Sequence, residues 1–150
     1  KNCGLEPRLK RANDIMIGDK KCGGILCESK VSGQKVNQMV IGLGININET
    51  KEDFPENLNV TSTSLFLESG RTQQRELVCA IFTTFFEKIL DDLDSAIDEW
   101  KKYCAHIDEE VSFTHDGVKQ HGIFKDINER GHALIEVNSN IKTFPSIILD

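Results

Sequence analysis

The residues best suited to chemistry gather in one stretch of the chain, Lys10–Leu26. The Asp14 carboxylate can hold a metal ion or a polarised hydrogen-bond donor, and the Lys21 ammonium can neutralise an anion. Gly23 and Gly24 follow directly, and they would let a ligand approach bare backbone. A carboxylate, an ammonium and a glycine gap together suit a substrate that bears phosphate.

Local structure has to bring Asp14 and Lys21 to one place. Ile15–Ile17 and Cys22–Leu26 are short apolar runs, and Gly18-Asp19 between them is a dipeptide typical of tight β-hairpin turns. We therefore predict a hairpin whose two ends meet at one site. Both charged side chains could then face the same ligand.

A second glycine-containing stretch, Gln38–Asn46, is predicted to be a strand. Gly42 and Gly44 share a face of this strand with Val40. Glycines inside a strand mark close approach of a ligand or of another backbone, so a ligand wall, a bulge and a packed helix all stay open. The stretch lacks the third glycine and the following helix of a dinucleotide-binding fingerprint, so it is not a Rossmann site.

The middle of the chain is predicted to contain a loop and two helices. Glu49–Ser62 is polar and reads as a surface loop. A helix is expected over about Gln73–Leu93, with a broad apolar stripe that we interpret as core. A second helix is expected over about Asp94–Tyr103, with Ile97 and Trp100 facing inward.

From Glu110 onward the apolar residues follow the pattern of short strands. Turn residues recur about every ten positions, at Asp116-Gly117, Asn128–Gly131 and Asn138–Asn140. This spacing predicts a small antiparallel barrel. His115, His121 and His132 lie near these turns, and solvated histidines are favoured over a metal site because no convergent ligand geometry is visible in the sequence.

The charge of the chain is unevenly distributed. The 150 residues carry a net charge of −6, which argues against electrostatic binding of nucleic acid. The first 37 residues hold eight Lys or Arg against four acidic residues, so their net charge is +4. This basic part contains the stretch Lys10–Leu26 described above. An anionic small substrate fits this balance, although solvated loop lysines explain it equally well.

The cysteines and the hydropathy indicate the compartment. The five cysteines are an odd number without Cys-x-x-Cys spacing, so we interpret them as reduced thiols of a cytoplasmic protein. No apolar run approaches the length of a membrane span, so no membrane partner is expected. The chain begins with Lys and a motif follows within ten residues, so we expect a piece of a longer chain.

Two motifs together resemble those of biotin–protein ligases. They are Asn13-Asp14 followed by Lys21-Cys-Gly-Gly-Ile-Leu26, and Val40-Ile-Gly-Leu-Gly-Ile-Asn46. The resemblance covers essentially the whole chain but only the latter part of the family's architecture. It implies an α+β fold, in which residues 1–104 are the last strands and helices of a mixed-sheet, class-II-synthetase-like catalytic domain. Residues 105–150 would form the family's small SH3-like β-barrel.

The resemblance also implies a two-step reaction and its site residues. Biotin is activated by ATP with Mg²⁺ to biotinyl-5'-AMP, and the biotinyl group passes to a lysine of a biotin carboxyl-carrier domain of a carboxylase. A homodimer is possible within this family. By the resemblance, Lys21 and Asp14 are catalytic and Asp14 is also the metal ligand. The binding positions it implies are Lys21, Gly24, Gly42 and Gly44 for biotin, and Lys10, Asn13, Asp14 and Asn46 for the nucleotide.

The sequence departs from the family pattern in two ways. The family usually has Lys-Trp-Pro-Asn-Asp where this chain has Lys10-Arg11-Ala12-Asn13-Asp14, so a fixed φ and a large stacking group are lost. The family's glycine- and arginine-rich loop is not found, and we expect it upstream, so that the 150 residues alone would be inactive. Two alternatives stay open: a non-catalytic binding module derived from this fold, and a relative of lipoate ligases.

Overall fold

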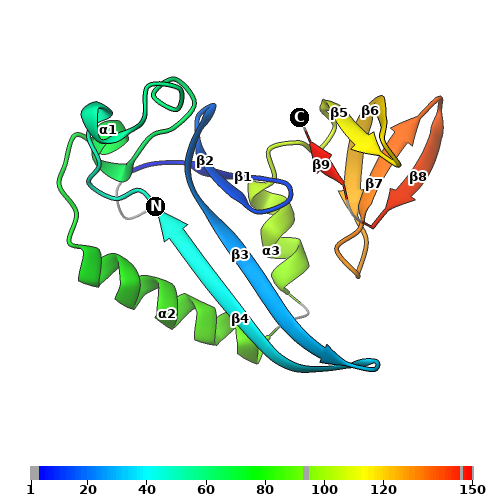
Figure 1. The fold of residues 1–150 in the computed structure, drawn as a ribbon, viewed down its shortest axis with the longest axis horizontal. Coiled ribbons are helices and arrows are strands. Elements are labelled where there is room, and N and C mark those ends of the chain that lie inside the picture. The colour runs from blue at the N-terminus through cyan, green and yellow to red at the C-terminus, as the bar shows by residue number, and fades with distance from the viewer. Residues whose placement is uncertain (1–3, 93–94, 146, 150) are drawn as a thin grey trace. The chain divides into compact units, whose positions relative to one another are not determined.

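The computed structural model describes residues 4–92, 95–145 and 147–149 (Figure 1). Contacts divide the chain into two units. The first unit comprises the residues up to Arg8 together with Asn13–Leu77, and the second comprises Leu9–Ala12 together with the chain from Val78 onward. Leu93 and Asp94, where one predicted helix ends and the next begins, lie outside the described residues.

A four-stranded sheet organises the first unit. Its strands are β1 (Pro7–Lys10), β2 (Asp14–Ile17), β3 (Lys20–Ser32) and β4 (Lys35–Ile45), in that spatial order, and Leu9 and Lys10 of β1 group with the second unit. The β2–β3 and β3–β4 pairs are antiparallel. The turn between β2 and β3 contains Gly18 at a φ of 57°, a left-handed conformation that glycine adopts without steric cost. The predicted hairpin is therefore confirmed, and the strand predicted over Gln38–Asn46 is confirmed up to Ile45, where β4 ends.

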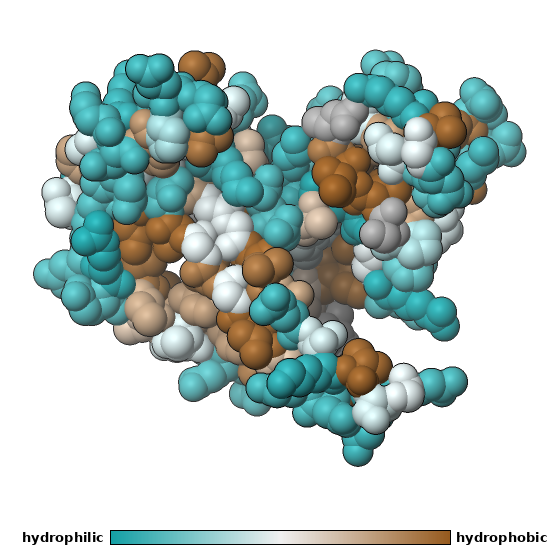
Figure 2. Space-filling view, in the orientation of Figure 1, coloured by the Kyte–Doolittle hydropathy of each residue, from teal (hydrophilic) through white to brown (hydrophobic). Residues whose placement is uncertain are grey.

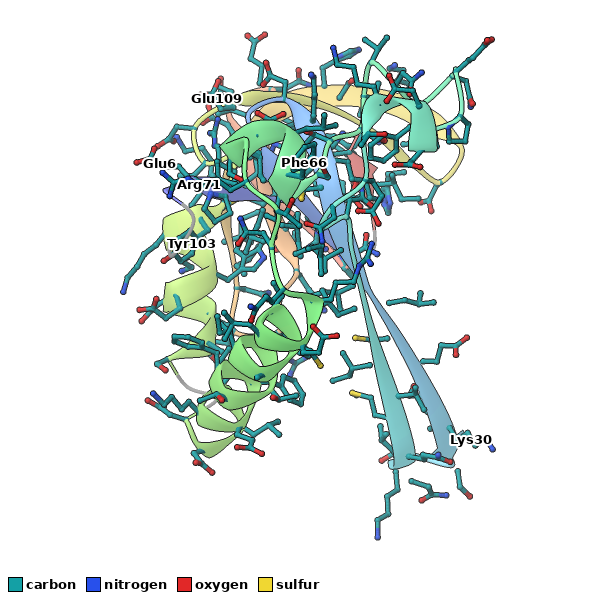
Figure 3. All side chains as sticks on the ribbon, turned by 90° about the vertical axis from the view of Figure 1, so that its left-hand side faces the viewer. Glu6, Lys30, Phe66, Arg71, Tyr103 and Glu109 are labelled. Atoms are coloured by element: carbon teal, nitrogen blue, oxygen red, sulfur yellow. The ribbon has the colours of Figure 1, made fainter. Side chains whose placement is uncertain are left out.

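The β3–β4 hairpin extends well beyond the predicted strands. The residue labelled Lys30 in Figure 3 lies near the far end of this hairpin. Several large apolar side chains along this hairpin are exposed to solvent, namely Leu26, Val31, Val36, Met39, Val40 and Ile41. Figure 2 shows brown, hydrophobic residues on the molecular surface, in keeping with this exposure.

The predicted loop after β4 contains a short 3₁₀ helix, Lys51–Asp53, and it is followed by helix α1, Leu65–Ser69. The sequence analysis missed α1 because five residues are too few to show helical periodicity. Ser64 caps the helix: the Leu67 amide donates to Ser64 Oγ at 3.1 Å. Gly70 ends it with a φ of 69°. Phe66 marks this helix in Figure 3.

The two longer helices are α2 (Arg75–Asp91) and α3 (Ala96–Tyr103), close to their predicted bounds. The interpretation of the α2 stripe as buried core is wrong for this chain. No residue of α2 is buried, and Leu77, Phe85 and Leu90 each expose more than half of their surface. The physical reason is that the described residues supply no layer that covers this stripe.

The second unit contains a five-stranded antiparallel sheet. Its strands are β5 (Glu110–His115), β6 (Val118–Ile127), β7 (Ala133–Val137), β8 (Asn140–Phe144) and β9 (Ile148–Leu149), in the order β8-β7-β6-β5-β9. The predicted antiparallel strands are confirmed. Among the described residues the sheet does not close into a barrel, because β8 and β9 stay at opposite ends of the strand order.

The core of the second unit lies against this sheet. Phe113, Phe124 and Ile135 are fully buried, and the Phe113 and Phe144 rings meet edge to face with centroids 4.9 Å apart. Partly buried side chains that pack against this core include Ile97 and Trp100 of α3 and Cys104. Their predicted inward orientation is confirmed.

Two further findings concern the described residues as a whole. No group of three or more His, Cys, Asp or Glu side chains there is arranged to hold a metal ion. None of the helices in the described ranges combines the length and apolarity needed to cross a membrane.

Candidate functional site

The β2–β3 hairpin brings the two predicted catalytic side chains into direct contact. Lys21 Nζ lies 2.5 Å from Asp14 Oδ1. The lysine side chain is 49% exposed and the aspartate 26% exposed, so the pair lies open to solvent at the end of the hairpin. An ammonium and a carboxylate in this position can exchange their mutual contact for an anion and a cation of a ligand.

A β-bulge makes this contact possible. In the register of β2 and β3, Asp14 lies opposite Gly24, but Met16 lies opposite Lys21. Cys22 is thereby left without a partner on β2, and the bulge reverses the alternation of the side chains. Without it, Lys21 and Gly24, three positions apart on one strand, would face opposite sides of the sheet.

Gly24 lies directly beside the Asp14–Lys21 pair. A Cβ atom added to Gly24 would lie 3.2 Å from the Asn13 carbonyl oxygen and 3.6 Å from both Asp14 Oδ1 and Lys21 Cε. The missing side chain therefore leaves room at the charged pair itself. This is the space that a ligand bound to both charges would need.

The other glycines of the two motifs have different surroundings. A Cβ atom on Gly23 would lie 2.4 Å from the Gly44 carbonyl oxygen, so Gly23 allows β3 and β4 to approach. Gly44 lies opposite Gly24, and Gly42 lies opposite Leu26. Added Cβ atoms there would meet only carbonyl oxygens, 4.0 and 3.8 Å away, so bare backbone continues along β4.

The two asparagines of the motifs use their side-chain amides on backbone carbonyls. Asn13 Nδ2 donates to the Ile25 carbonyl oxygen at 2.6 Å, and Asn46 Nδ2 donates to the Thr63 carbonyl oxygen at 2.9 Å. Asn13 therefore ties the start of β2 to β3, and Asn46 ties the end of β4 to the segment that contains Thr63.

Lys10 and Arg11 group with the second unit. Arg11 Nη1 donates to the Gly131 carbonyl oxygen at 2.7 Å, and Nη2 donates to the Pro145 carbonyl oxygen at 3.4 Å. Burial lowers the pKa of the Arg11 guanidinium from its ordinary value. Arg11 thus stabilises the second unit.

Cys22 is fully buried beside the site. Its Sγ atom donates to the Asn46 carbonyl oxygen at 3.4 Å. Burial, together with the nearby Glu68 and Glu49 carboxylates, raises the pKa of the thiol to about 11. The thiol therefore stays protonated at neutral pH and acts as a structural donor, because the thiolate is the nucleophilic form.

The sequence analysis missed one segment that contacts the site residues, Thr61–Ser64. The Lys21 amide donates to the Thr61 carbonyl oxygen at 2.8 Å, and the Thr63 amide donates to the Lys21 carbonyl oxygen at 2.9 Å. Thr63 and Ser64 are 1% and 0% exposed. The only signal in the sequence is a run of hydroxyl residues before an apolar stretch, which also fits an ordinary loop.

A protein-family model matches the first part of the chain. The model of the Biotin/lipoate A/B protein ligase family matches residues 4–46, which contain Asp14, Lys21 and all four glycines discussed above. Residues 4–46 of the chain are therefore similar to this family. The match spans β1 to β4 and ends at Asn46, so it covers the same hairpins that build the charged pair.

Curated relatives extend the similarity beyond these strands. The chain is 31% identical over 144 residues to the "Bifunctional ligase/repressor BirA" of Bacillus subtilis, an alignment covering 93% of this chain and 44% of that protein. It is 24% identical over 152 residues to the "Biotin--[acetyl-CoA-carboxylase] ligase" of Paracoccus denitrificans, covering 96% and 63%. The chain therefore spans less than two thirds of these relatives.

Solved structures support the same fold. The apo biotin protein ligase of Aquifex aeolicus superposes with a TM-score of 0.81 at 24% identity, covering 96% of this chain and 65% of that one. The same protein in complex with biotin and ATP gives a TM-score of 0.73 at 25% identity, covering 96% and 62%. The chain has the α+β fold, with antiparallel sheets, of the matching part of these ligases.

Proposed function

We propose that this chain is part of a biotin–protein ligase, which activates biotin with ATP to biotinyl-5'-AMP and transfers the biotinyl group to a lysine of a carrier domain. The observation that carries the proposal is the Asp14–Lys21 pair beside the open backbone of Gly24. The printed names of the curated relatives and the Aquifex complex with biotin and ATP support it.

The first step joins two anions, so its barrier has a large electrostatic component. A biotin carboxylate oxygen attacks the α-phosphorus of ATP, a P–O bond forms, and pyrophosphate leaves. Lys21 would stand between the carboxylate and the phosphate and offset their repulsion, with charge that also stabilises the transition state. Gly24, Gly42 and Gly44 would provide the backbone wall against which biotin lies.

The nucleotide side of the site would be formed by residues next to this pair. Asn13 and Asp14 follow each other at the start of β2, and Asn46 directly follows β4. Lys10 completes the set that the family resemblance implies for the nucleotide.

Mg²⁺ is implied by the use of ATP, and the residues present fit it. Mg²⁺ in nucleotide sites is commonly held by one or two carboxylates together with substrate phosphates and water, so a cage of several protein ligands is not required. Asp14, a partly exposed carboxylate at the charged pair, would supply the protein ligand. The ion would supply Lewis-acid polarisation of the phosphate oxygens.

In the second step the neutral amine of a carrier lysine attacks the carbonyl carbon of the mixed anhydride. An amide bond forms, AMP leaves with the phosphate oxygen, and the amine loses a proton. The partner would be the carrier domain of a biotin-dependent carboxylase.

The remaining features of the family also belong to this proposal. Residues 1–104 would be the latter part of a mixed-sheet, class-II-synthetase-like catalytic domain, and residues 105–150 its SH3-like C-terminal domain. The protein would act in the cytoplasm, and a homodimer is compatible with the fold. Biotin is favoured over lipoate because the Paracoccus denitrificans relative and the Aquifex aeolicus structures carry biotin in their names.

Calorimetric titration of a non-hydrolysable biotinyl-AMP analogue tests the proposal. We expect binding by the complete protein that contains this chain, and loss of most of that binding in Lys21→Ala. Lys30→Ala is the matched control, since Lys30 lies on the same strand but at the far end of the β3–β4 hairpin.

The titration also separates the competing hypotheses. Absence of binding by the complete protein would refute the ligase and favour a non-catalytic module, whereas preference for a lipoyl-AMP analogue would favour a lipoate ligase. The same titration into the 150 residues alone tests the expectation that they do not form a working site by themselves.

A further inference from the structure

The backbone of Lys21 is held by the Thr61–Ser64 segment, which runs parallel to it. The Lys21 backbone makes two hydrogen bonds with this segment: its amide donates to the Thr61 carbonyl oxygen, and its carbonyl oxygen accepts from the Thr63 amide. These two hydrogen bonds are not part of the β2–β3–β4 ladder. They fix the position of the Lys21 Cα atom from outside the sheet.

Side chains hold this segment in turn. The buried Thr63 hydroxyl donates to Glu68 Oε1 at 2.6 Å, and the Thr63 carbonyl oxygen accepts the Asn46 amide. The Ser64 hydroxyl donates to the Glu49 carbonyl oxygen at 2.6 Å. Thr63 is therefore fixed at its amide, its carbonyl and its hydroxyl.

The Thr63–Glu68 bond is the contact in this set that a side-chain substitution can remove cleanly. A hydroxyl that donates to a carboxylate makes a charge-assisted bond, stronger than one between neutral groups. Without that acceptor, a buried hydroxyl would remain unsatisfied. The position of the Thr61–Ser64 segment thus depends on the Glu68 carboxylate of the short helix α1 (Leu65–Ser69, Figure 3).

We propose that Thr63 and Glu68 are positioning residues that act on the reaction through Lys21. The proposal rests on the ligase function proposed above. The Lys21 ammonium sits at the end of a flexible four-carbon stem, so its place depends on the position of the Lys21 Cα atom and on the contact with Asp14. A small displacement of the strand would misplace the charge between two reacting anions, where rates are sensitive to shifts of about 1 Å.

A double-mutant cycle on the complete protein tests the proposal, with affinity for the biotinyl-AMP analogue as the readout. Thr63→Val removes the hydroxyl at nearly constant volume, and we expect about tenfold weaker binding, the scale of one lost charge-assisted hydrogen bond. In the Lys21→Ala background the same change should weaken binding by less than about twofold, because coupled residues are not additive. Thr63→Ser retains the hydroxyl and should restore binding.

Glu68 provides an independent pair of variants, in case Thr63→Val folds poorly. Glu68→Ala should reproduce the Thr63→Val effect, and Glu68→Gln, which keeps an acceptor oxygen, should recover a large part of the affinity. Thr72→Val is the matched control, since Thr72 is exposed in the same unit and outside this network.

The outcomes separate this inference from the function on which it rests. If Lys21→Ala binds the analogue as well as the unmodified protein does, the ligase assignment of Lys21 fails. If Lys21→Ala weakens binding but Thr63→Val is equally harmful with and without Lys21, Thr63 has a general structural role and the inference is overturned. Dependence of the Thr63→Val effect on Lys21, with rescue by serine, supports it.

Discussion

Substitution of the two adjacent glycines of the Lys21-Cys-Gly-Gly motif by alanine should affect different properties. Gly23→Ala should lower the stability of the protein, and Gly24→Ala should weaken ligand binding. In Gly23→Ala the new Cβ would lie 2.4 Å from the Gly44 carbonyl oxygen. Real Cβ atoms do not come that close to backbone oxygen, so β3 and β4 would have to separate locally. Overpacking of this kind costs about 1–3 kcal/mol of unfolding free energy.

Gly24→Ala meets a much milder contact. Its Cβ would lie 3.2 Å from the Asn13 carbonyl oxygen, so the neighbour has to move by only a few tenths of an ångström. The cost is partly offset because alanine loses less conformational entropy on folding, a gain of roughly 0.4–1 kcal/mol. The net change in unfolding free energy should stay within about 1 kcal/mol, but the methyl group would occupy the space beside Asp14 and Lys21.

Two assays on the complete protein distinguish the variants. In thermal unfolding Gly23→Ala should lower Tm by about 2–4 °C for each kcal/mol lost, while Gly24→Ala should unfold close to the unmodified protein. In calorimetry with the biotinyl-AMP analogue, Gly24→Ala should lose at least about tenfold in affinity, equivalent to 1.4 kcal/mol. A stable Gly23→Ala, or a Gly24→Ala that binds normally, would refute this division of roles.

Three further predictions concern stability. Arg11→Met should cost about 1–3 kcal/mol, because the carbonyl oxygens of Gly131 and Pro145 lose their donor; unchanged urea unfolding would contradict this. The Cys22 thiol has its pKa raised from 9.0 to about 11, so its contribution to stability is complete below pH 9 and is lost as pH rises toward 11; the fall should be smaller in Cys22→Ala, and an identical pH profile would exclude the thiol. Phe124→Ala should cost about 3–5 kcal/mol by leaving a cavity in the second unit, and a Tm within about 2 °C of the unmodified value would show that its core does not limit stability.

Strong local signals made most of the fold predictable from the sequence. Gly18-Asp19 specifies a tight turn, and alternating apolar residues on either side leave little choice other than a hairpin. The positive φ values at Asp116 and Gly117 likewise mark the turn between β5 and β6. These features depend on a few neighbouring residues, so sequence spacing is sufficient to find them.

Features that depend on distant partners were not predictable. The α2 stripe has helical periodicity, but periodicity shows only that a face is apolar and not that the described chain contains the layer that covers it. The capped helix α1 was hidden because a five-residue helix takes its stability from Ser64 and from tertiary contacts. The Thr61–Thr63 contacts with Lys21 cross about 40 residues of sequence, and no local pattern encodes them.

The charged site depends on one residue that the motif alone does not single out. Cys22 is the bulged residue whose extra position turns Lys21 toward Asp14. Its small, buried side chain also donates to the Asn46 carbonyl oxygen, which ties β3 to the end of β4. A larger residue would need volume that this buried position does not offer, and a charged one would need a partner. The direction of Lys21 therefore follows from packing beneath the strand as much as from the turn that precedes it.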